Sequence, residues 1–212
     1  MSNLVKYGRT FHLPWSPGAT DDDKVLDSVA HFVGHDVVVT EKMDGENTTV
    51  YPTGYTHARS VDSKSHPSRD WLKANAAQWA WKIPSGWRVC GENLYARHSI
   101  AYTTLPSYFM MFGVFDENDM ALDWDTVESL ALELQVPTVP VLYRGVWDET
   151  EIRKLFTGDS RCGGAQEGYV VRLARSFRWE ENAIAKFVRT NHVQTDEHWM
   201  HKSVIPNGLS QC

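Results

Sequence analysis

The sequence has few cysteines, no long apolar run and no excess of positive charge, and each absence excludes a class of protein. Cys90, Cys162 and Cys212 show no Cys-x-x-Cys spacing and cannot all pair within one chain, so we expect a reduced, cytoplasmic protein. No apolar run reaches the length of a membrane span, which argues against a membrane partner. The 21 basic and 27 acidic side chains give a net charge of −6, so a nucleic-acid partner needs a local basic patch.

What the chain does have is a high aromatic content, 12%, and many short apolar segments bounded by turn residues. Period-2 and β-branched segments predict strands near residues 37–40, 48–51, 55–60, 89–94, 108–115, 138–142, 167–173 and 183–188. Helical spacing predicts helices near 25–32, 68–81, 125–134 and 148–156. We therefore expect an α+β fold with mostly antiparallel sheets flanked by helices. One domain is expected over 1–212, with an N-terminal loop and helix (1–35), a core (36–190) and a tail (191–212).

Acidic residues mark two of the expected helix starts. Asp21–Asp23 precede the first helical pattern, and we interpret them as an acidic turn that leads into that helix. Asp125 and Glu128 have the spacing of a capping box at the start of another helix.

The most informative stretch is Thr40–Asn47, which joins two expected strands. Lys42 ends the first strand, and Asp44 and Gly45 form the turn, where glycine permits a positive φ or a close approach of other atoms. One interpretation is a plain hairpin with an exposed lysine. The other is a nucleophile, because partial burial lowers the pKa of an amine.

Charged residues also lie at the ends of several other strands, which indicates a groove where these ends converge. Lysine and arginine suit phosphates, whereas carboxylates suit a divalent metal or ribose hydroxyls. Phe112 and Phe115 each offer a ring for a base, but an alternating strand puts them on opposite faces. We expect Phe115 to reach the base and Phe112 to be in the core. The charged residues in question are Lys42, Asp44, Arg59, Glu92, Asp116, Glu167, Lys186 and Arg189.

The order of these motifs resembles the covalent nucleotidyltransferases, which include RNA ligases, DNA ligases and mRNA capping enzymes. The motifs follow one another as Lys42-x-Asp44-Gly45, Arg59, Gly91-Glu92, Phe115-Asp116, Glu167-Gly168-Tyr169-Val170-Val171 and Lys186. The resemblance covers roughly residues 36–190 and is specific because several motifs occur in the right order. Among the branches the chain is most similar to compact bacterial and phage ATP-dependent RNA ligases.

The resemblance implies an adenylylation domain in which Lys42 attacks ATP and becomes a lysyl-AMP. The AMP then passes to an RNA 5′-phosphate, and a 3′-hydroxyl displaces it, with Mg²⁺ or Mn²⁺ as cofactor. Roles follow by family likeness: Glu92 for ribose, Phe115 for adenine, Glu167 and Asp116 for the metal, Lys186 for the α-phosphate. Backbone groups near Glu41 would read the adenine edge, Asp44 and Gly45 would line the nucleotide site, and Arg59 would place phosphates or the RNA end. The family often has a second lysine after Lys186, and here only Arg189 is near enough to replace it.

Other functions stay open from the sequence. A DNA ligase or capping enzyme would use an OB-fold domain, for which we expect no room after residue 190, so an RNA ligase is favoured. A non-catalytic nucleotide or RNA-end binding module is the remaining alternative, although it would have little need for a nucleophilic lysine. For RNA contacts we expect a patch made of Arg59, Lys64, Arg69, Arg97 and Arg175.

Overall fold

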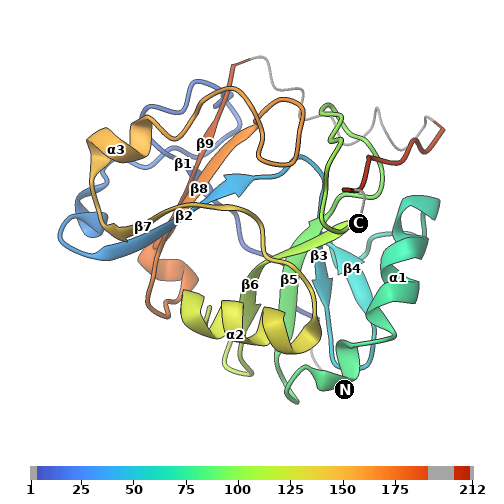
Figure 1. Cartoon of the computed structure of the whole chain (residues 1–212). Helices are drawn as coiled ribbons and strands as arrows, with labels where there is room; N and C mark the ends of the chain where they lie inside the picture. The colour runs from blue at the N-terminus through green and yellow to red at the C-terminus, as the bar shows by residue number, and fades with distance from the viewer. Residues whose placement is uncertain (1–3, 191–202, 211–212) are drawn as a thin grey trace.

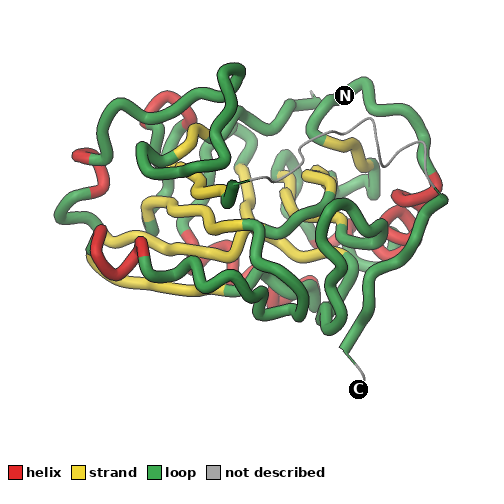
Figure 2. The backbone as a smooth tube through the Cα atoms, turned by 90° about the horizontal axis from the view of Figure 1, so that it is seen from above, coloured by secondary structure: helices red, strands yellow, loops and turns green. Residues whose placement is uncertain are grey.

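Two β-sheets form the centre of the protein. The computed structural model describes residues 4–190 and 203–210. The first sheet has five strands in the order β1–β9–β8–β2–β7, and the second has four in the order β4–β3–β5–β6. Figure 1 shows the two sheets side by side, and Figure 2 shows the helices outside the strands. The strands are β1 (Phe11–His12), β2 (Asp36–Lys42), β3 (Glu46–Val50), β4 (Thr56–Ala58), β5 (Arg88–Asn93), β6 (Phe109–Phe115), β7 (Val141–Val146), β8 (Gly168–Leu173) and β9 (Ile184–Val188).

The first sheet is organised around β2, because its Val37–Thr40 segment is buried and β-branched. β7 and β8 pair with it antiparallel on either side, and β9 pairs antiparallel with β8. Only the short β1 pairs in parallel, with β9. The sheets are therefore mostly antiparallel, as predicted.

The second sheet begins directly after β2, since β3 follows the Met43–Gly45 turn. β3 pairs antiparallel with β4 and β5, and β5 pairs antiparallel with β6. The β2–β3 connection therefore passes from one sheet to the other and does not form a hairpin ladder. This crossing places the end of β2 between the sheets.

Within the described residues, three α-helices and four short 3₁₀ helices cover the sheets. They are α1 (Asp70–Ala76), α2 (Trp124–Leu134), α3 (Glu149–Arg153), η1 (Ala30–Phe32), η2 (Pro67–Arg69), η3 (Ala80–Lys82) and η4 (Trp179–Glu181). α2 buries Val127, Leu130 and Leu134 in the same cluster as Phe109 and Val114 of β6. None of the helices in the described part of the chain is both long and apolar enough to span a membrane.

The starts of the helices expected over 125–134 and 25–32 differ from the prediction. The Asp123 side chain, and not Asp125, caps α2 by accepting from the Thr126 N–H, while Asp125 and Glu128 pair with Arg144 of β7. The helix expected over 25–32 is reduced to η1, because the chain from Lys24 to Leu26 hydrogen-bonds to His12 instead. The Asp148 side chain caps α3 by accepting from the Glu151 N–H.

Candidate functional site

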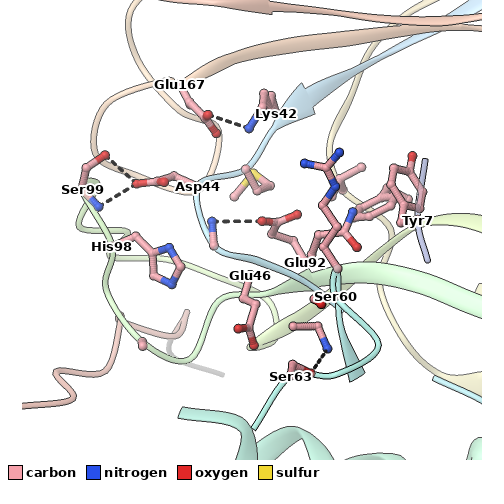
Figure 3. A pocket seen from close by; sticks show the side chains of 18 of the residues that line it. Tyr7, Lys42, Asp44, Glu46, Ser60, Ser63, Glu92, His98, Ser99 and Glu167 are labelled. Atoms are coloured by element: carbon pink, nitrogen blue, oxygen red, sulfur yellow. Dashed lines mark hydrogen bonds and ion pairs between the residues drawn. The ribbon is translucent and has the colours of Figure 1, made fainter. Parts of the chain in front are cut away.

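A large cavity of about 1160 Å³ opens at the junction of the two sheets. Its walls include the ends of β2 and β3, the β5 carboxylate Glu92, and residues of β8 and β9. Most of the site residues that the sequence predicted line this cavity: Glu41, Lys42, Asp44, Gly45, Arg59, Glu92, Glu167 and Lys186. Figure 3 shows Lys42, Asp44, Glu92 and Glu167 around this space. The predicted groove of converging strand ends therefore exists.

Lys42 is the last residue of β2, and its amine forms an ion pair with Glu167. Nζ lies 2.6 Å from Oε1 of Glu167, which is 1% exposed (Figure 3). Burial acts to lower the pKa of Lys42, but the carboxylates of Glu167 and Glu92 outweigh it and raise this pKa above its usual value. The expectation of a lowered pKa was therefore wrong for the ligand-free site. Glu167 and Glu92 therefore favour the protonated form of the Lys42 amine.

Glu92 lies on β5 opposite the β2–β3 turn and is held by backbone. The Gly45 N–H donates to its Oε1 over 3.1 Å. Burial raises the pKa of Glu92 to about 8, against the attraction of Lys42. A Cβ at Gly45 would lie 2.6 Å from the Asn93 carbonyl oxygen, so glycine is needed for this close approach and not for a positive φ.

Asp44 holds the neighbouring loop in place. Its Oδ2 accepts hydrogen bonds from the Ser99 N–H, the Ser99 hydroxyl and the Ile100 N–H, at 2.8 to 2.9 Å. Its own N–H donates to the Tyr102 hydroxyl. Asp44 lines the cavity, and these contacts show that it also fixes the 98–100 loop beside it (Figure 3).

Glu41, Arg59 and Lys186 also line the cavity. The Glu41 N–H donates to the Pro140 carbonyl, and its carboxylate accepts from the Arg161 N–H, while burial raises its pKa. Arg59 is exposed at the cavity rim after β4. Lys186 of β9 is half-buried, and burial together with the charge of Lys42 lowers its pKa to about 8.

Phe112 and Tyr7 are aromatic residues of the cavity wall, whereas Phe115, which we expected to reach the base, does not line the cavity. Phe115 is 3% exposed and packs under the Arg88 guanidinium in the core. A β-bulge lies at this point of β6. The β5–β6 register passes from Cys90↔Gly113 to Gly91↔Met111 and leaves Phe112 unpaired, so the expected alternation is broken and both rings contact Tyr7.

Two more predicted residues lie outside the cavity. The Asp116 carboxylate closes its own turn by accepting from the Asn118 and Met120 N–H groups, at the far end of β6 from Glu92. Arg189 directly follows β9 and does not line the cavity. Its N–H donates to the Glu167 carbonyl.

The expected basic patch is reduced in the same way. Arg59, Lys64, Arg69 and Arg97 all line the cavity, but the Arg69 guanidinium already forms an ion pair with Glu46. Arg175 pairs with Glu181 away from the cavity.

Asp23 and Arg172 are among the cavity residues that the sequence analysis missed. Asp23 comes from the N-terminal segment that crosses β9, and its Oδ1 lies 3.8 Å from Nζ of Lys186. Arg172 is 6% exposed and donates to the Phe112 carbonyl and to the Thr40 hydroxyl. A basic residue inside the apolar Val170–Leu173 run was the one available sequence signal for Arg172. Asp23 gave none, because its partner is distant in sequence.

The acidic side chains of the cavity fit a divalent metal together with the phosphates of a bound nucleotide. Across 4–190 and 203–210 no group of three or more His, Cys, Asp or Glu side chains is arranged to hold an ion. Glu92 and Glu167 both face the cavity and both act on Lys42. Because Mg²⁺ is commonly bound by one or two carboxylates and substrate phosphates, these two acids fit it once a nucleotide is present.

Solved structures with a similar fold include RNA ligases. A Naegleria gruberi RNA ligase mutant with ATP and Mn is 18% identical at a TM-score of 0.56, over 74% of this chain and 51% of that one. An archaeal ATP-dependent RNA ligase is 15% identical at a TM-score of 0.59, over 88% of this chain and 48% of that one. The chain thus spans about half the length of these ligases. The likeness confirms the α+β nucleotidyltransferase fold.

Comparison at the level of sequence gives the family. No curated protein was found to match the chain. Residues 35–188, in contrast, match the family model described as RNA ligase, and they include the turn after β2, β5, β8 and β9 with the cavity residues these elements carry. Since this match covers well over half of the 212 residues, the protein belongs to the RNA ligase family.

Proposed function

We propose that the protein is an ATP-dependent RNA ligase that first transfers AMP from ATP to Lys42. The observation that carries this proposal is the Lys42 amine, 2.6 Å from Glu167 in a cavity that Lys186 of the same sheet also lines. Membership of the RNA ligase family supports it, as do the fold relatives that were solved with ATP and Mn.

In the first step Nζ of Lys42 attacks the α-phosphorus of ATP. A P–N bond forms, the bond from the α-phosphorus to the bridging oxygen breaks, and pyrophosphate leaves. The amine must lose a proton before it attacks and a second as the phosphoramidate forms. The Glu167 carboxylate is within hydrogen-bond distance to take the first.

The remaining cavity residues bind and orient the nucleotide. Lys186 and Arg59 supply positive charge for the phosphates, and the Phe112 ring supplies a face on which adenine stacks. Glu167 and Glu92 would hold Mg²⁺ or Mn²⁺, which neutralises phosphate charge when bound. Glu92 is also placed to accept from ribose hydroxyls, the role that the family likeness gave it.

We propose further that the AMP passes to an RNA 5′-phosphate and that an RNA 3′-hydroxyl then displaces it. Arg59, Lys64 and Arg97 at the cavity wall are the cations available for the RNA ends. We also propose a cytoplasmic location, in keeping with the buried free thiols of Cys90 and Cys162.

Incubation with α-labelled ATP and Mg²⁺, followed by denaturing electrophoresis, tests the first step. We expect label on the wild-type chain and none on Lys42→Ala. Lys73→Ala removes an exposed helix lysine outside the cavity and should label normally. Labelling of a folded Lys42→Ala protein at the wild-type level would rule out this nucleophile, and equal labelling from GTP would favour a capping-type enzyme.

A further inference from the structure

Of the lysines that line the cavity, Lys42 and Lys186 each have their own carboxylate. Lys42 has Glu167 at 2.6 Å, and Lys186 has Asp23 at 3.8 Å. The first pair is made of residues that family motifs contain. Asp23 belongs to no such motif, yet its side chain is only 14% exposed and lines the same cavity.

The N-terminal segment holds Asp23 in a defined orientation. Its Oδ2 accepts from the N–H and hydroxyl of Thr20, at 3.2 and 3.0 Å, and lies 3.5 Å from Nε2 of His12. His12 is fully buried in β1, directly opposite Lys186 of β9. With Oδ2 engaged in this way, Oδ1 is the oxygen nearest to the Lys186 amine.

Asp23 carries a negative charge at neutral pH and His12 carries none. Burial acts to raise the pKa of Asp23, but the hydrogen bonds from Thr20 and the charge of Lys186 bring it below its usual value. Burial and the charge of Lys186 lower the pKa of His12 to about 4. The contact between Asp23 and Lys186 is therefore between opposite charges.

Lys186 is in an environment that works against its charge. Burial, Lys42 on β2 and Arg59 after β4 lower its pKa, while Asp23 and Glu167, which precedes β8, act to raise it. Glu167 is already bonded to Lys42. Asp23 is thus the acid nearest to Lys186 among the described residues.

We propose that Asp23 is a positioning residue that keeps Lys186 charged and directed into the cavity, ready for the phosphates of an incoming nucleotide. This inference rests on the proposed function, because Lys186 grips a phosphate only as a cation. Once a triphosphate is bound, its negative charge keeps Lys186 protonated, and the contribution of Asp23 to that protonation becomes small.

The proposal predicts a pH-dependent defect that is confined to nucleotide capture. In Asp23→Asn the amide still accepts from Thr20, but the charge is gone and Lys186 loses its proton at lower pH. If its titration moves down by about one pH unit, adenylylation at limiting ATP falls about fivefold near pH 8 and changes little at pH 6. The rate at saturating ATP, which reports the complex, changes much less.

The experiment compares Asp23→Asn with Asp22→Asn, which removes an exposed acid one residue away. Adenylylation is followed from pH 6 to 8.5 at limiting and saturating ATP, with thermal melting at each pH. We expect the pH-dependent loss only in Asp23→Asn. A loss of equal size at every pH would show a merely structural role, and wild-type behaviour throughout would overturn the proposal.

A second measurement needs no activity. Competitive labelling with an amine-reactive reagent, read by mass spectrometry, gives the pH at which Lys186 loses its proton, with Lys73 as an exposed reference. We expect a lower midpoint for Lys186 in Asp23→Asn, and an unchanged midpoint would overturn the inference. If wild-type protein takes up no AMP, the proposed function fails, whereas the Lys186 midpoint still decides the role of Asp23.

Discussion

Phe112 and Phe115 lie three residues apart on β6, and exchanging each for alanine should have opposite consequences. Phe112 is half-buried at the cavity wall, so Phe112→Ala removes a stacking surface. Loss of one base–aromatic stack costs about 1–3 kcal/mol, which weakens ATP binding by roughly 5- to 150-fold. The structural cost should be smaller than for a fully buried ring.

Phe115 is instead a core residue. It lies beneath Arg88, with the guanidinium 4.2 Å from the ring centroid, and packs edge-on against Tyr7 at 6.0 Å. Truncation of a buried phenylalanine costs about 3–5 kcal/mol, and loss of the cation–π contact adds to this. Phe115→Ala should therefore lower the melting temperature strongly, while the folded fraction binds ATP nearly as the wild type does.

ATP titrations and thermal melts of both variants separate these effects. We expect weak binding with a modest change in melting for Phe112→Ala, and the reverse for Phe115→Ala. Weak ATP binding by folded Phe115→Ala, with normal binding by Phe112→Ala, would refute the reasoning from the β-bulge.

Three further predictions concern the turn, the buried acid and the RNA. Gly45→Ala should lose stability and adenylylation together, since its Cβ would lie 2.6 Å from the Asn93 carbonyl; melting and labelling with ATP check this. Glu92→Gln should stabilise the fold in the absence of nucleotide. The pKa of the Glu92 carboxyl rises to about 8 on folding, so the wild-type protein loses stability as the pH rises from about 4.5 to 8. The gain in melting temperature should grow across that range, and a constant difference would contradict it. A nicked duplex should be joined faster than free single-stranded ends at low salt, because the chain carries a net charge of −6 and pre-aligned ends supply proximity; faster joining of free ends would count against this.

Local sequence patterns predicted the strands well and the helix ends less well. The run Val37–Thr40 and the segments near 89–94, 108–115 and 167–173 are strands because β-branched and apolar residues fill buried sheet positions. The helix expected over 68–81 is broken into η2, α1 and η3. The N-terminal segment, expected to be a loop and a helix, contains β1 and η1, since its backbone groups pair with β9, which lies about 170 residues away. The single-domain division of the chain stays a prediction, and Asn191–Lys202 lie outside the described residues.

The candidate site was predictable where strand ends decided it and unpredictable where backbone irregularity or long-range contact did. Lys42, Glu92, Glu167 and Lys186 converge because the sheets meet at their strand ends. The bulge at Phe112 has no composition signal, and the sequence did not predict that Phe112, and not Phe115, lines the cavity. The order of residues also gave the wrong sign for the pKa of Lys42, because the neighbouring acids come from β5 and from the residue before β8.

The most direct test of the account is to locate AMP on the protein. Wild-type protein incubated with ATP and Mg²⁺, then digested and mapped by mass spectrometry, should carry AMP on the peptide that contains Lys42, joined through an acid-labile P–N bond. AMP on Lys186 or on any other residue, or a folded protein that takes up none, would contradict the central claim.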